Sequence, residues 1–525
     1  MRLKDSSAGG SVVFLTMFSV LSQLLGFLYR VCLSRMVGAQ VMGLYQLVMP
    51  VYSVLMSITA IGLTAAVSNF TSRYLALDNV RAVRQTVRSC MILLGCLMIP
   101  VAAVTAALYD PISVYLLGDA RTQMGLLLLL PCVALTGVEN LHKHFFYGSG
   151  QVRTPAVVEL LEQVIRAGAV LGLLALFLPQ NPERTVGLIV VGMILCEIFS
   201  SVTLVTFYRC RLGRMGDGGA GEQPRRLYRR VAAIALPVGA TALLGNLMGA
   251  VNAALIPQRL VAGGVRLEQA MSDFGVLCGM TMPMLSLPTV FLGALNLIMV
   301  PRVAGNCALG RTDRANWEVL RTLEMVSLII LPCMALMTVV GSDLGVLLFG
   351  ESKAGQYIVP LGVATACSCF QAVLSGGLNA ANHQGTAALI ALICDVVQLV
   401  LTALLMGRPG GGMGGFVIGV VVSSVLGLAL CGLAIRRHTG LRVKLCRMLA
   451  LPGLATLLSW QLALLLHNGL RQAQAPQTVQ VGSVLAFGAV VYLSALCAMG
   501  AGQNGFFPRT GKNCVDKSKQ GRYNS

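Results

Sequence analysis

Fourteen long apolar stretches divide this chain, and each is long enough to cross a lipid bilayer. A membrane-spanning helix needs about 20 apolar residues. The stretches cover roughly residues 11–33, 42–66, 88–109, 122–147, 155–178, 185–208, 231–256, 272–300, 319–341, 357–380, 387–407, 413–435, 447–467 and 480–500. Hydrophobic residues make up 56% of the chain and charged residues only 11%, which is too little charge to cover a water-soluble globule. The sequence therefore predicts an all-α integral membrane protein with fourteen transmembrane helices.

The basic residues alternate between the two sides of these predicted helices. If the N-terminus is cytoplasmic, 29 of the 39 lysines and arginines lie in cytoplasmic segments, 9 lie on the other side, and Arg166 lies within a helix. This alternation is the positive-inside rule. We expect a multi-pass protein of the cytoplasmic membrane with both termini in the cytoplasm. The net charge of +19 then faces membrane lipids and not nucleic acid. The first apolar stretch continues past Leu25 without a cleavage site, so we expect it to be retained.

A second constraint is an internal repeat with an offset of 232 residues. Leu117-Gly118-Asp119 recurs as Phe349-Gly350-Glu351, Pro100 recurs as Pro332, and Thr154 recurs as Thr386. A long fixed period in a membrane protein predicts two related lobes, and six helices per lobe make the repeats parallel. The predicted organisation is an N-terminal lobe over 1–208, a flexible cytoplasmic linker over 209–230, a C-terminal lobe over 231–440, two extra transmembrane helices over 441–503 and a basic cytoplasmic tail over 504–525.

Charged residues inside membrane helices are the first candidates for function, because each costs at least about 2.5–3.5 kcal/mol to insert. Glu162 and Arg166 are four residues apart in the fifth predicted helix, which is the favourable order for an ion pair. Glu197 lies at a similar depth in the sixth helix, so we predict a Glu162–Arg166–Glu197 cluster. It either locks neighbouring helices together or serves as an ion relay or substrate contact. Asp395 lies at the corresponding depth in lobe two.

Three arginines at the ends of predicted helices are candidates for binding a substrate in a central cavity. Arg30 and Arg35 close the first helix, and Arg259 closes the seventh. Guanidinium groups match the acceptor oxygens of a diphosphate, although such arginines also extend toward lipid headgroups. Pro283 and Pro288, five residues apart in the eighth helix, predict a hinge, with tight helix packing as the alternative.

Enzymatic and metal-dependent functions find no support in the sequence. The sixteen cysteines are scattered through apolar stretches and give neither a disulfide framework nor a metal site. His142 and His144, near Glu139, are two residues apart and point to different helix faces. No Ser-His-Asp, paired-carboxylate or nucleotide-binding pattern occurs, so we expect neither an enzyme nor a bound cofactor.

Several stretches carry a family resemblance. They are Gly26-Phe27-Leu28-Tyr29-Arg30, Met42-Gly43-Leu44-Tyr45-Gln46, Thr154-Pro155 with Glu162-Gln163 and Arg166, and Leu287-Pro288-Thr289. Through them the chain resembles the polysaccharide-transport branch of the multidrug/oligosaccharidyl-lipid/polysaccharide (MOP) flippase superfamily, which includes the lipid II flippases. The resemblance implies a V-shaped pair of lobes with alternating access to a central cavity. It also implies a lipid-linked saccharide as substrate, such as lipid II or another undecaprenyl-diphosphate-linked intermediate of cell-wall, spore or polysaccharide synthesis, with its tail held by the last two helices.

The chain departs from the lipid II flippases in its cavity arginines. Two first-helix arginines of that pattern fall on Gln23 and Tyr29, and the second helix, 42–66, has no arginine. The exact lipid therefore stays open. Two alternative functions also stay open: a cation-coupled multidrug antiporter on the same fold, in which Glu162, Glu197 or Asp395 binds a coupling cation, and a non-transporting scaffold that recruits peptidoglycan synthases for envelope or spore-cortex synthesis.

Overall fold

The computed structural model describes residues 8–499 except 217, 220, 409–411 and 442–444. The predicted basic tail, 504–525, lies outside the described residues. Thirteen of the described helices are long and apolar enough to cross a membrane. The first of these, Met17–Ala76, has 60 residues and would measure about 90 Å if straight, three times the thickness of a bilayer core. It is broken at Gly38, whose φ of 76° and ψ of 173° are not helical. The break makes two crossings and confirms the predicted fourteen.

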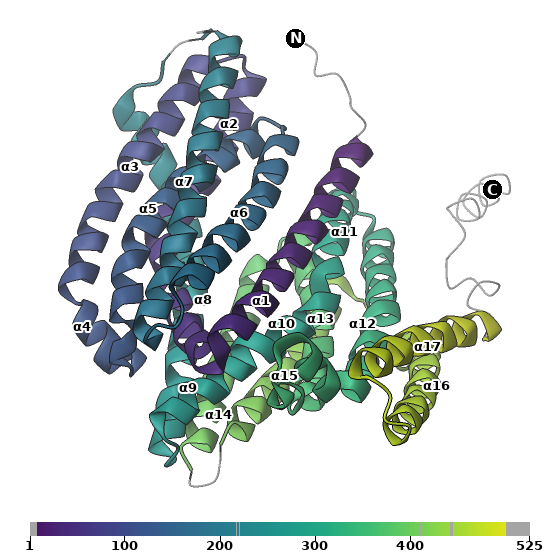
Figure 1. The fold of residues 1–525 in the computed structure, drawn as a ribbon. Helices are drawn as coiled ribbons and strands as arrows, with labels where there is room; N and C mark the ends of the chain where they lie inside the picture. Colours follow the sequence, from purple (N-terminus) through teal and green to yellow (C-terminus); the bar gives the residue numbers. More distant parts are fainter. Residues whose placement is uncertain (1–7, 217, 220, 409–411, 442–444, 500–525) are drawn as a thin grey trace, which may run out of the picture.

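Gly38 makes this break possible because residues with a side chain rarely adopt a positive φ. The break lies within α1 (Ala8–Met56), which continues through a π-helical turn, Ser57–Ile61, into α2 (Gly62–Ala76). The two halves of α1 run in different directions. The first half lies between the two lobes, and the second half enters the N-terminal lobe (Figure 1).

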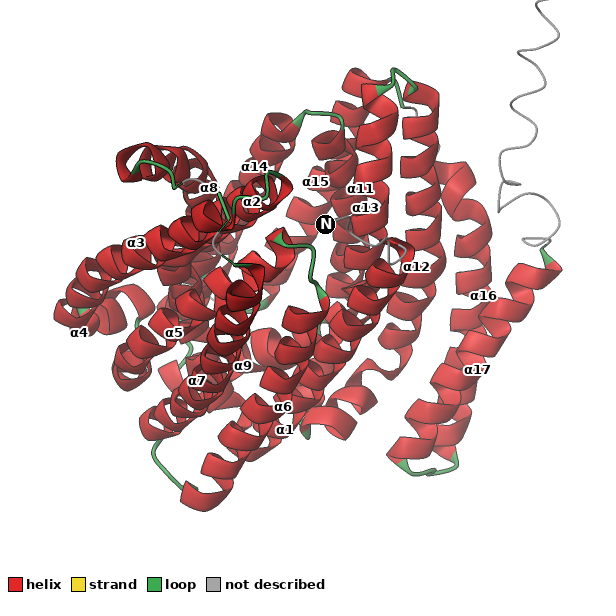
Figure 2. Cartoon of the chain, turned by 90° about the horizontal axis from the view of Figure 1, so that it is seen from above, coloured by secondary structure: helices red, strands yellow, loops and turns green. Residues whose placement is uncertain are grey.

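The N-terminal lobe continues with α3 (Val80–Ala107), α4 (Tyr109–Pro111), a π-helical turn (Ile112–Leu117), a 3-10 turn (Ala120–Thr122), α5 (Gln123–Gly148), α6 (Arg153–Phe177) and α7 (Pro182–Met215). The C-terminal lobe contains α8 (Pro224–Ala262), α9 (Leu267–Val276), a π-helical turn (Leu277–Thr281), α10 (Met282–Ser286), a 3-10 turn (Leu287–Thr289), α11 (Val290–Ala308), α12 (Thr312–Phe349), a 3-10 turn (Ser352–Gly355), α13 (Ile358–Ala380), α14 (Gln384–Met406) and α15 (Gly414–Thr439). Helices α16 (Leu445–Gln472) and α17 (Gln477–Ala498) form a hairpin beside the second lobe (Figures 1 and 2).

The repeat seen in the sequence is present in the backbone. The helical segment Val80–Leu117 and α12 (Thr312–Phe349) begin and end at residues that differ by 232 in number. Both end at a left-handed glycine, Gly118 with φ 78° and ψ 12° and Gly350 with φ 74° and ψ 13°. The next residue in each lobe, Asp119 or Glu351, then accepts a hydrogen bond from the backbone N–H two residues later. The two lobes thus share even the details of one loop.

The predicted linker over 209–230 is much shorter than expected and is not free. Helix α7 extends to Met215 and α8 begins at Pro224, because the arginines at both ends of the linker favour helix and the glycines are confined to its centre. The short connection packs on the start of α3. The backbone N–H of Arg81 donates to the oxygen of Gly218, and the N–H of Glu222 donates to Gln85 Oε1 at 2.8 Å.

The two lobes touch where repeat-related glycines face each other. A Cβ on Gly275 of α9 would overlap the carbonyl oxygen of Ala39 and would lie 2.6 Å from the nitrogen of Gly43. A Cβ on Gly43 would overlap the carbonyl oxygen of Met271. Backbones approach this closely only where no side chain intervenes. This Gly43–Gly275 crossing closes one end of the interface between the lobes.

Two reciprocal sets of hydrogen bonds reinforce the closed end. Arg35, at the end of lobe one's first crossing, donates to the carbonyl oxygens of Leu347 and Leu348, with Nε to Leu348 O at 2.7 Å. Gln258, near the end of α8, donates to the carbonyl oxygens of Tyr115 and Leu116, at 2.7 Å for Leu116. The acceptors correspond to each other in the repeat. Each lobe therefore holds the last carbonyl groups of the other lobe's third crossing, which lack partners within their own helix.

The C-terminal hairpin is attached to α12 by polar pairs as well as by apolar packing. His467 Nε2 lies 2.7 Å from Asp343 Oδ2, Trp460 Nε1 donates to Thr338 Oγ1 at 3.0 Å, and the hydroxyl of Tyr492 donates to the oxygen of Leu328 at 2.9 Å. Hydrogen bonds between membrane helices contribute about 0.6–2 kcal/mol each.

We expect the double substitution Asp343→Ala and Trp460→Phe to loosen the hairpin without unfolding the lobes, because it removes two of these attachments. Hydrogen–deuterium exchange should then speed up in α16 and α17 and stay unchanged in α5 and α7. The control is Ser494→Ala, whose exposed hydroxyl donates only to Val491 within its own helix. Equal exchange in the double variant and the wild-type protein would show that apolar packing alone holds the hairpin.

Candidate functional site

A polar cavity of about 460 Å³ lies between the two lobes. Its walls come from both halves of α1, from α6 and α7, and from the segment that runs from α10 to the start of α11. The lining residues are Ser22, Gln23, Gly26, Phe27, Tyr29, Arg30, Tyr45, Met49, Glu159, Gln163, Arg166, Met193, Pro283, Ser286, Leu287 and Val290. A second hollow of about 310 Å³ adjoins it toward the N-terminus and shares Ser22, Gln23, Glu159 and Val290. Together they run along α1 from Phe18 to Arg30, away from the closed end.

Arg30 is the cavity's available positive charge. It is exposed and, among the described residues, has no carboxylate within ion-pair distance. Beside it, Tyr29 is 8% exposed and its hydroxyl is buried without a hydrogen-bond partner in the described chain. Gln23 and Gln163 add neutral donors and acceptors, and Glu159 adds one carboxylate at the edge of both hollows. Because Arg166, the other cation in the lining, is paired with Glu162 and Glu197, the cavity combines one available cation with groups that suit a hydroxylated ligand.

The predicted cluster adjoins this cavity through Arg166, which is part of the lining. Arg166 Nη2 donates to Glu162 and to Glu197 Oε1, at 3.2 Å for Glu197. Its Nε lies 3.4 Å from Cys196 Sγ. Glu162 and Glu197 are buried, at 5% and 2% exposure. The structure thus brings together the three residues that the sequence predicted, on α6 and α7, and their role as a relay or lock remains a prediction.

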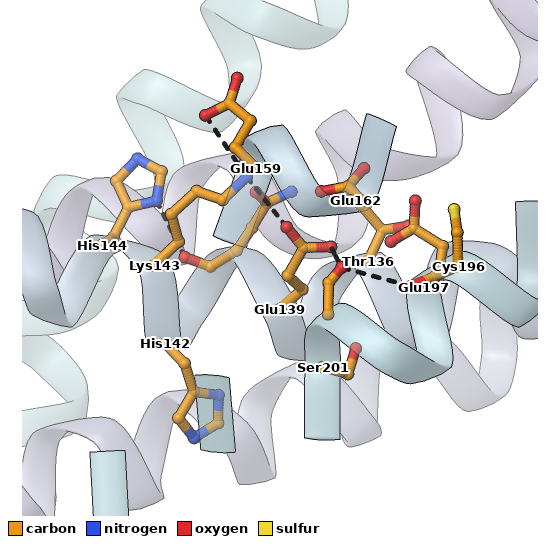
Figure 3. A network of polar contacts seen from close by, with 12 residues as sticks. Thr136, Glu139, His142, Lys143, His144, Glu159, Glu162, Cys196, Glu197 and Ser201 are labelled. Atoms are coloured by element: carbon orange, nitrogen blue, oxygen red, sulfur yellow. Dashed lines mark hydrogen bonds and ion pairs between the residues drawn. The ribbon is translucent and has the colours of Figure 1, made fainter. Parts of the chain in front are cut away.

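A second ion group lies next to this cluster (Figure 3). Lys143 Nζ lies 2.9 Å from Glu139 and 4.0 Å from Glu159, and Ser200 donates to Glu139 at 3.2 Å. The two groups together hold four carboxyl groups and two basic side chains, so acidic side chains outnumber basic ones in this part of lobe one. His142 and His144 point in opposite directions, as their spacing predicted (Figure 3).

One trio of side chains has the spacing of a cation site. Oxygens of Glu162 and Glu197 and the sulfur of Cys196 lie within 4.8 Å of one another. The guanidinium of Arg166 contacts all three. Because this group already supplies the positive charge that a metal ion would bring, the trio is better described as the binding site of an arginine side chain.

Arg35 and Arg259, predicted beside Arg30, lie elsewhere. Among the described residues, the lining of the cavity includes Arg30 but neither of these two. Arg35 bonds the end of α12, and Arg259 lies against Gly407 at the end of α14, where a Cβ would meet its Cδ at 3.7 Å. The predicted arginine group at the outer end of one cavity is therefore corrected. Helix spacing placed all three at helix ends, but the neighbours at those ends are lobe-two carbonyls and α14.

Asp395 lines a separate hollow of about 150 Å³ in lobe two, with Asn252 of α8 and Gln398 of α14. The Oδ1 atom of Asn252 is buried without a partner in the described chain. These oxygens lie apart from the lobe-one cluster, so the repeat places one polar site in each lobe.

The predicted hinge prolines lie where the eighth crossing is irregular. Pro283 follows the π-helical turn Leu277–Thr281, and Pro288 lies within the 3-10 turn Leu287–Thr289. Proline cannot donate a hydrogen bond to the preceding turn. In the same irregular segment, the hydroxyl of Thr281 donates to the carbonyl oxygen of Ala354 at 2.8 Å. Pro283 also lines the cavity. A bend of this crossing would therefore change the cavity's shape, and the hinge role stays a prediction.

Sequence reasoning missed two members of the site. Glu159 precedes Glu162 by one turn and Arg166 by two, so helix periodicity alone could have placed it on the same face. Tyr29 could not be identified from the sequence, because a tyrosine in an apolar helix can face the lipid, the protein core or a cavity equally well.

Two six-helix repeats around a polar cavity define the class of two-lobed membrane transporters. The fold is similar to that of a structure titled "Lipid II flippase MurJ, inward closed conformation", with a TM-score of 0.67 at 9% identity over 93% of this chain and 99% of that one. It is also similar to an inward-facing multidrug resistance MATE family transporter of the MOP superfamily, with a TM-score of 0.66 at 13% identity over 80% of this chain and 94% of that one.

The chain belongs to the polysaccharide biosynthesis protein family, whose model matches residues 9–306. It is 22% identical to stage V sporulation protein B of Bacillus subtilis (strain 168) over 418 residues, which cover 78% of this chain and 79% of that protein. It is 21% identical to the lipid II flippase MurJ of the same organism over 523 residues, which cover 91% of this chain and 93% of that protein. The predicted resemblance to a polysaccharide-transport family is confirmed by the family match.

Proposed function

We propose that the protein moves a lipid-linked saccharide across the cytoplasmic membrane. The observation that carries the proposal is Arg30 in a polar cavity between the lobes, with no ion-pair partner in the part of the chain that the structure describes. An isolated guanidinium in such a place suits a phosphate group, and the neighbouring amides and hydroxyls suit a sugar. Membership of the polysaccharide biosynthesis family and similarity to a lipid II flippase support this substrate class. The substrate is lipid II or another undecaprenyl-diphosphate-linked intermediate.

The movement that we propose is alternating access by rocking of the two lobes. The lobes touch at the Gly43–Gly275 crossing, and the first half of α8 also packs on lobe one, where a Cβ on Gly62 of α2 would overlap the carbonyl oxygen of Ala235. The cavity lies between the lobes along the first half of α1. The distribution of basic residues supports a cytoplasmic N-terminus, which makes this an inward-facing state. The lipid tail stays in the bilayer and lies against the α16–α17 hairpin.

The substitution Arg30→Gln tests the assignment of the cavity. It should lower substrate affinity by about ten- to a hundredfold, because a hydrogen bond to a charged group contributes about 1.5–3 kcal/mol. Flipping of a fluorescent undecaprenyl-diphosphate-linked sugar by the purified protein in liposomes measures the loss. The control is Arg184→Gln, at the exposed start of α7.

Normal flipping by Arg30→Gln would contradict the role of the cavity. Absence of flipping by the wild-type protein, together with capture of peptidoglycan synthases, would favour the scaffold function. Native mass spectrometry of the detergent-extracted protein would identify which lipid-linked sugar stays bound.

A cation-coupled antiporter is the second candidate, favoured by the excess of carboxylates in lobe one. Among the described residues, the ion-pair partners of Glu139, Glu159, Glu162 and Glu197 are Lys143 and Arg166. Buried negative charge without full compensation is costly, so uptake of a proton or a metal cation during the cycle is favourable there. Drug accumulation in expressing cells separates this function from lipid transport.

A further inference from the structure

We propose that the hydroxyl of Tyr29 is a specificity-determining contact for the substrate, donating a hydrogen bond to a phosphate oxygen that Arg30 holds in the cavity. The inference rests on the function proposed above and names a second group that recognises the same chemistry. The ligand class is a polyprenyl phosphate ester, whether a monophosphate or a diphosphate.

The first observation is the state of the Tyr29 hydroxyl. The side chain lines the cavity and is 8% exposed, yet its hydroxyl oxygen has no hydrogen-bond partner among the described residues. A buried hydroxyl without a partner is energetically unfavourable, and most buried polar groups in proteins are paired. By contrast, the hydroxyl of Tyr52, on the same helix, donates to Thr136 Oγ1 at 3.0 Å. An acceptor supplied by a ligand would remove the cost at Tyr29.

The second observation is the charge around this hydroxyl. Tyr29, Arg30 and Arg166 all line the same cavity. The guanidinium of Arg166 is already bound by Glu162 and Glu197, so two negative charges compensate it. Arg30 has no such partner in the described chain and is therefore the stronger attractor for an anion. A neutral donor in the lining of the same cavity adds a contact to the phosphate without adding a further buried charge.

The substitution Tyr29→Phe isolates the hydroxyl. Replacing an unpaired buried donor with an apolar group of the same shape is close to neutral for folding, so the variant should melt at or above the wild-type temperature when no lipid is present. Its affinity for the phosphorylated lipid should nevertheless fall about tenfold or more. A purely structural role would give the opposite result, with a lower melting temperature and unchanged affinity.

The experiment measures lipid binding by the full-length purified protein with undecaprenyl phosphate, undecaprenyl diphosphate and undecaprenol as probes. The expected result is weaker binding of the phosphorylated lipids by Tyr29→Phe, unchanged binding of undecaprenol, and wild-type affinities for the control Tyr52→Phe. The phosphorylated lipid with the larger loss shows which headgroup the hydroxyl contacts.

Two results would overturn the proposal in distinguishable ways. If the wild-type protein prefers the phosphorylated lipids and Tyr29→Phe binds them equally well, the hydroxyl is not a contact and the proposed function survives. If the wild-type protein binds undecaprenol as tightly as the phosphorylated lipids, the proposed function fails together with the inference.

Discussion

Replacing Gly43 with valine should abolish transport, because the two lobes could no longer meet at their closed end. The new Cβ would overlap the carbonyl oxygen of Met271 in α9. Backbone on both sides is helical and cannot yield as a flexible side chain would. The overlap must therefore separate α1 from α9 and strain the neighbouring hydrogen bonds of Arg35 and Gln258. We expect the conformational equilibrium to shift away from the state with this end closed.

Two measurements check this prediction. Flipping in liposomes should fall to background. A pair of spin labels at the closed end, one in the loop before α9 and one in the loop after the segment Val80–Leu117, should report a longer distance. The control is Gly172→Val, at an exposed helical position with nothing within 4 Å of the added Cβ. Both variants replace a helical glycine with valine, so the change in helix propensity is the same. The difference between them is the contact with α9 that Gly43 makes and Gly172 does not. Normal transport by Gly43→Val would mean that the contact is not needed in the cycle.

The second large effect concerns Arg166. Its replacement by methionine should lower the stability of the protein by about 3–5 kcal/mol, because Glu162 and Glu197 would be left buried without a counter-charge. The loss should appear as a marked fall in the temperature at which the detergent-solubilised protein aggregates. Removing only the arginine costs more than replacing the whole ion pair with uncharged residues, because the two carboxylates stay buried without a counter-charge.

The triple variant Glu162→Gln, Arg166→Met and Glu197→Gln provides the matched test. With both carboxylates neutralised, most of the lost stability should return. Recovery combined with normal transport would identify the cluster as a lock between α6 and α7, and recovery without transport would identify it as part of the working site. Equal stability of Arg166→Met and the wild-type protein would contradict the buried ion pairs themselves.

The sequence alone predicted the features that follow from chain length and helix geometry. Apolar stretches of about 20 residues fix the number of crossings because a bilayer has a fixed thickness. The fixed offset of 232 predicted the two lobes, and the glycines at 118 and 350 adopt the same left-handed conformation. Glu162 and Arg166 are paired because residues four apart share a helix face.

Only the tertiary structure decided which of these residues share a cavity. Arg30 and Arg35 lie five residues apart at the end of one crossing, yet Arg30 lines the cavity and Arg35 bonds the end of α12. Helix periodicity gives the angle between two side chains on one helix but not the direction in which the helix faces its neighbours. In a membrane, lipid and helix neighbours are equally apolar, so the sequence does not mark the inward face. The packing of the lobes therefore decided that Tyr29 and Arg30 face the cavity and that Gly43 meets Gly275 at the closed end.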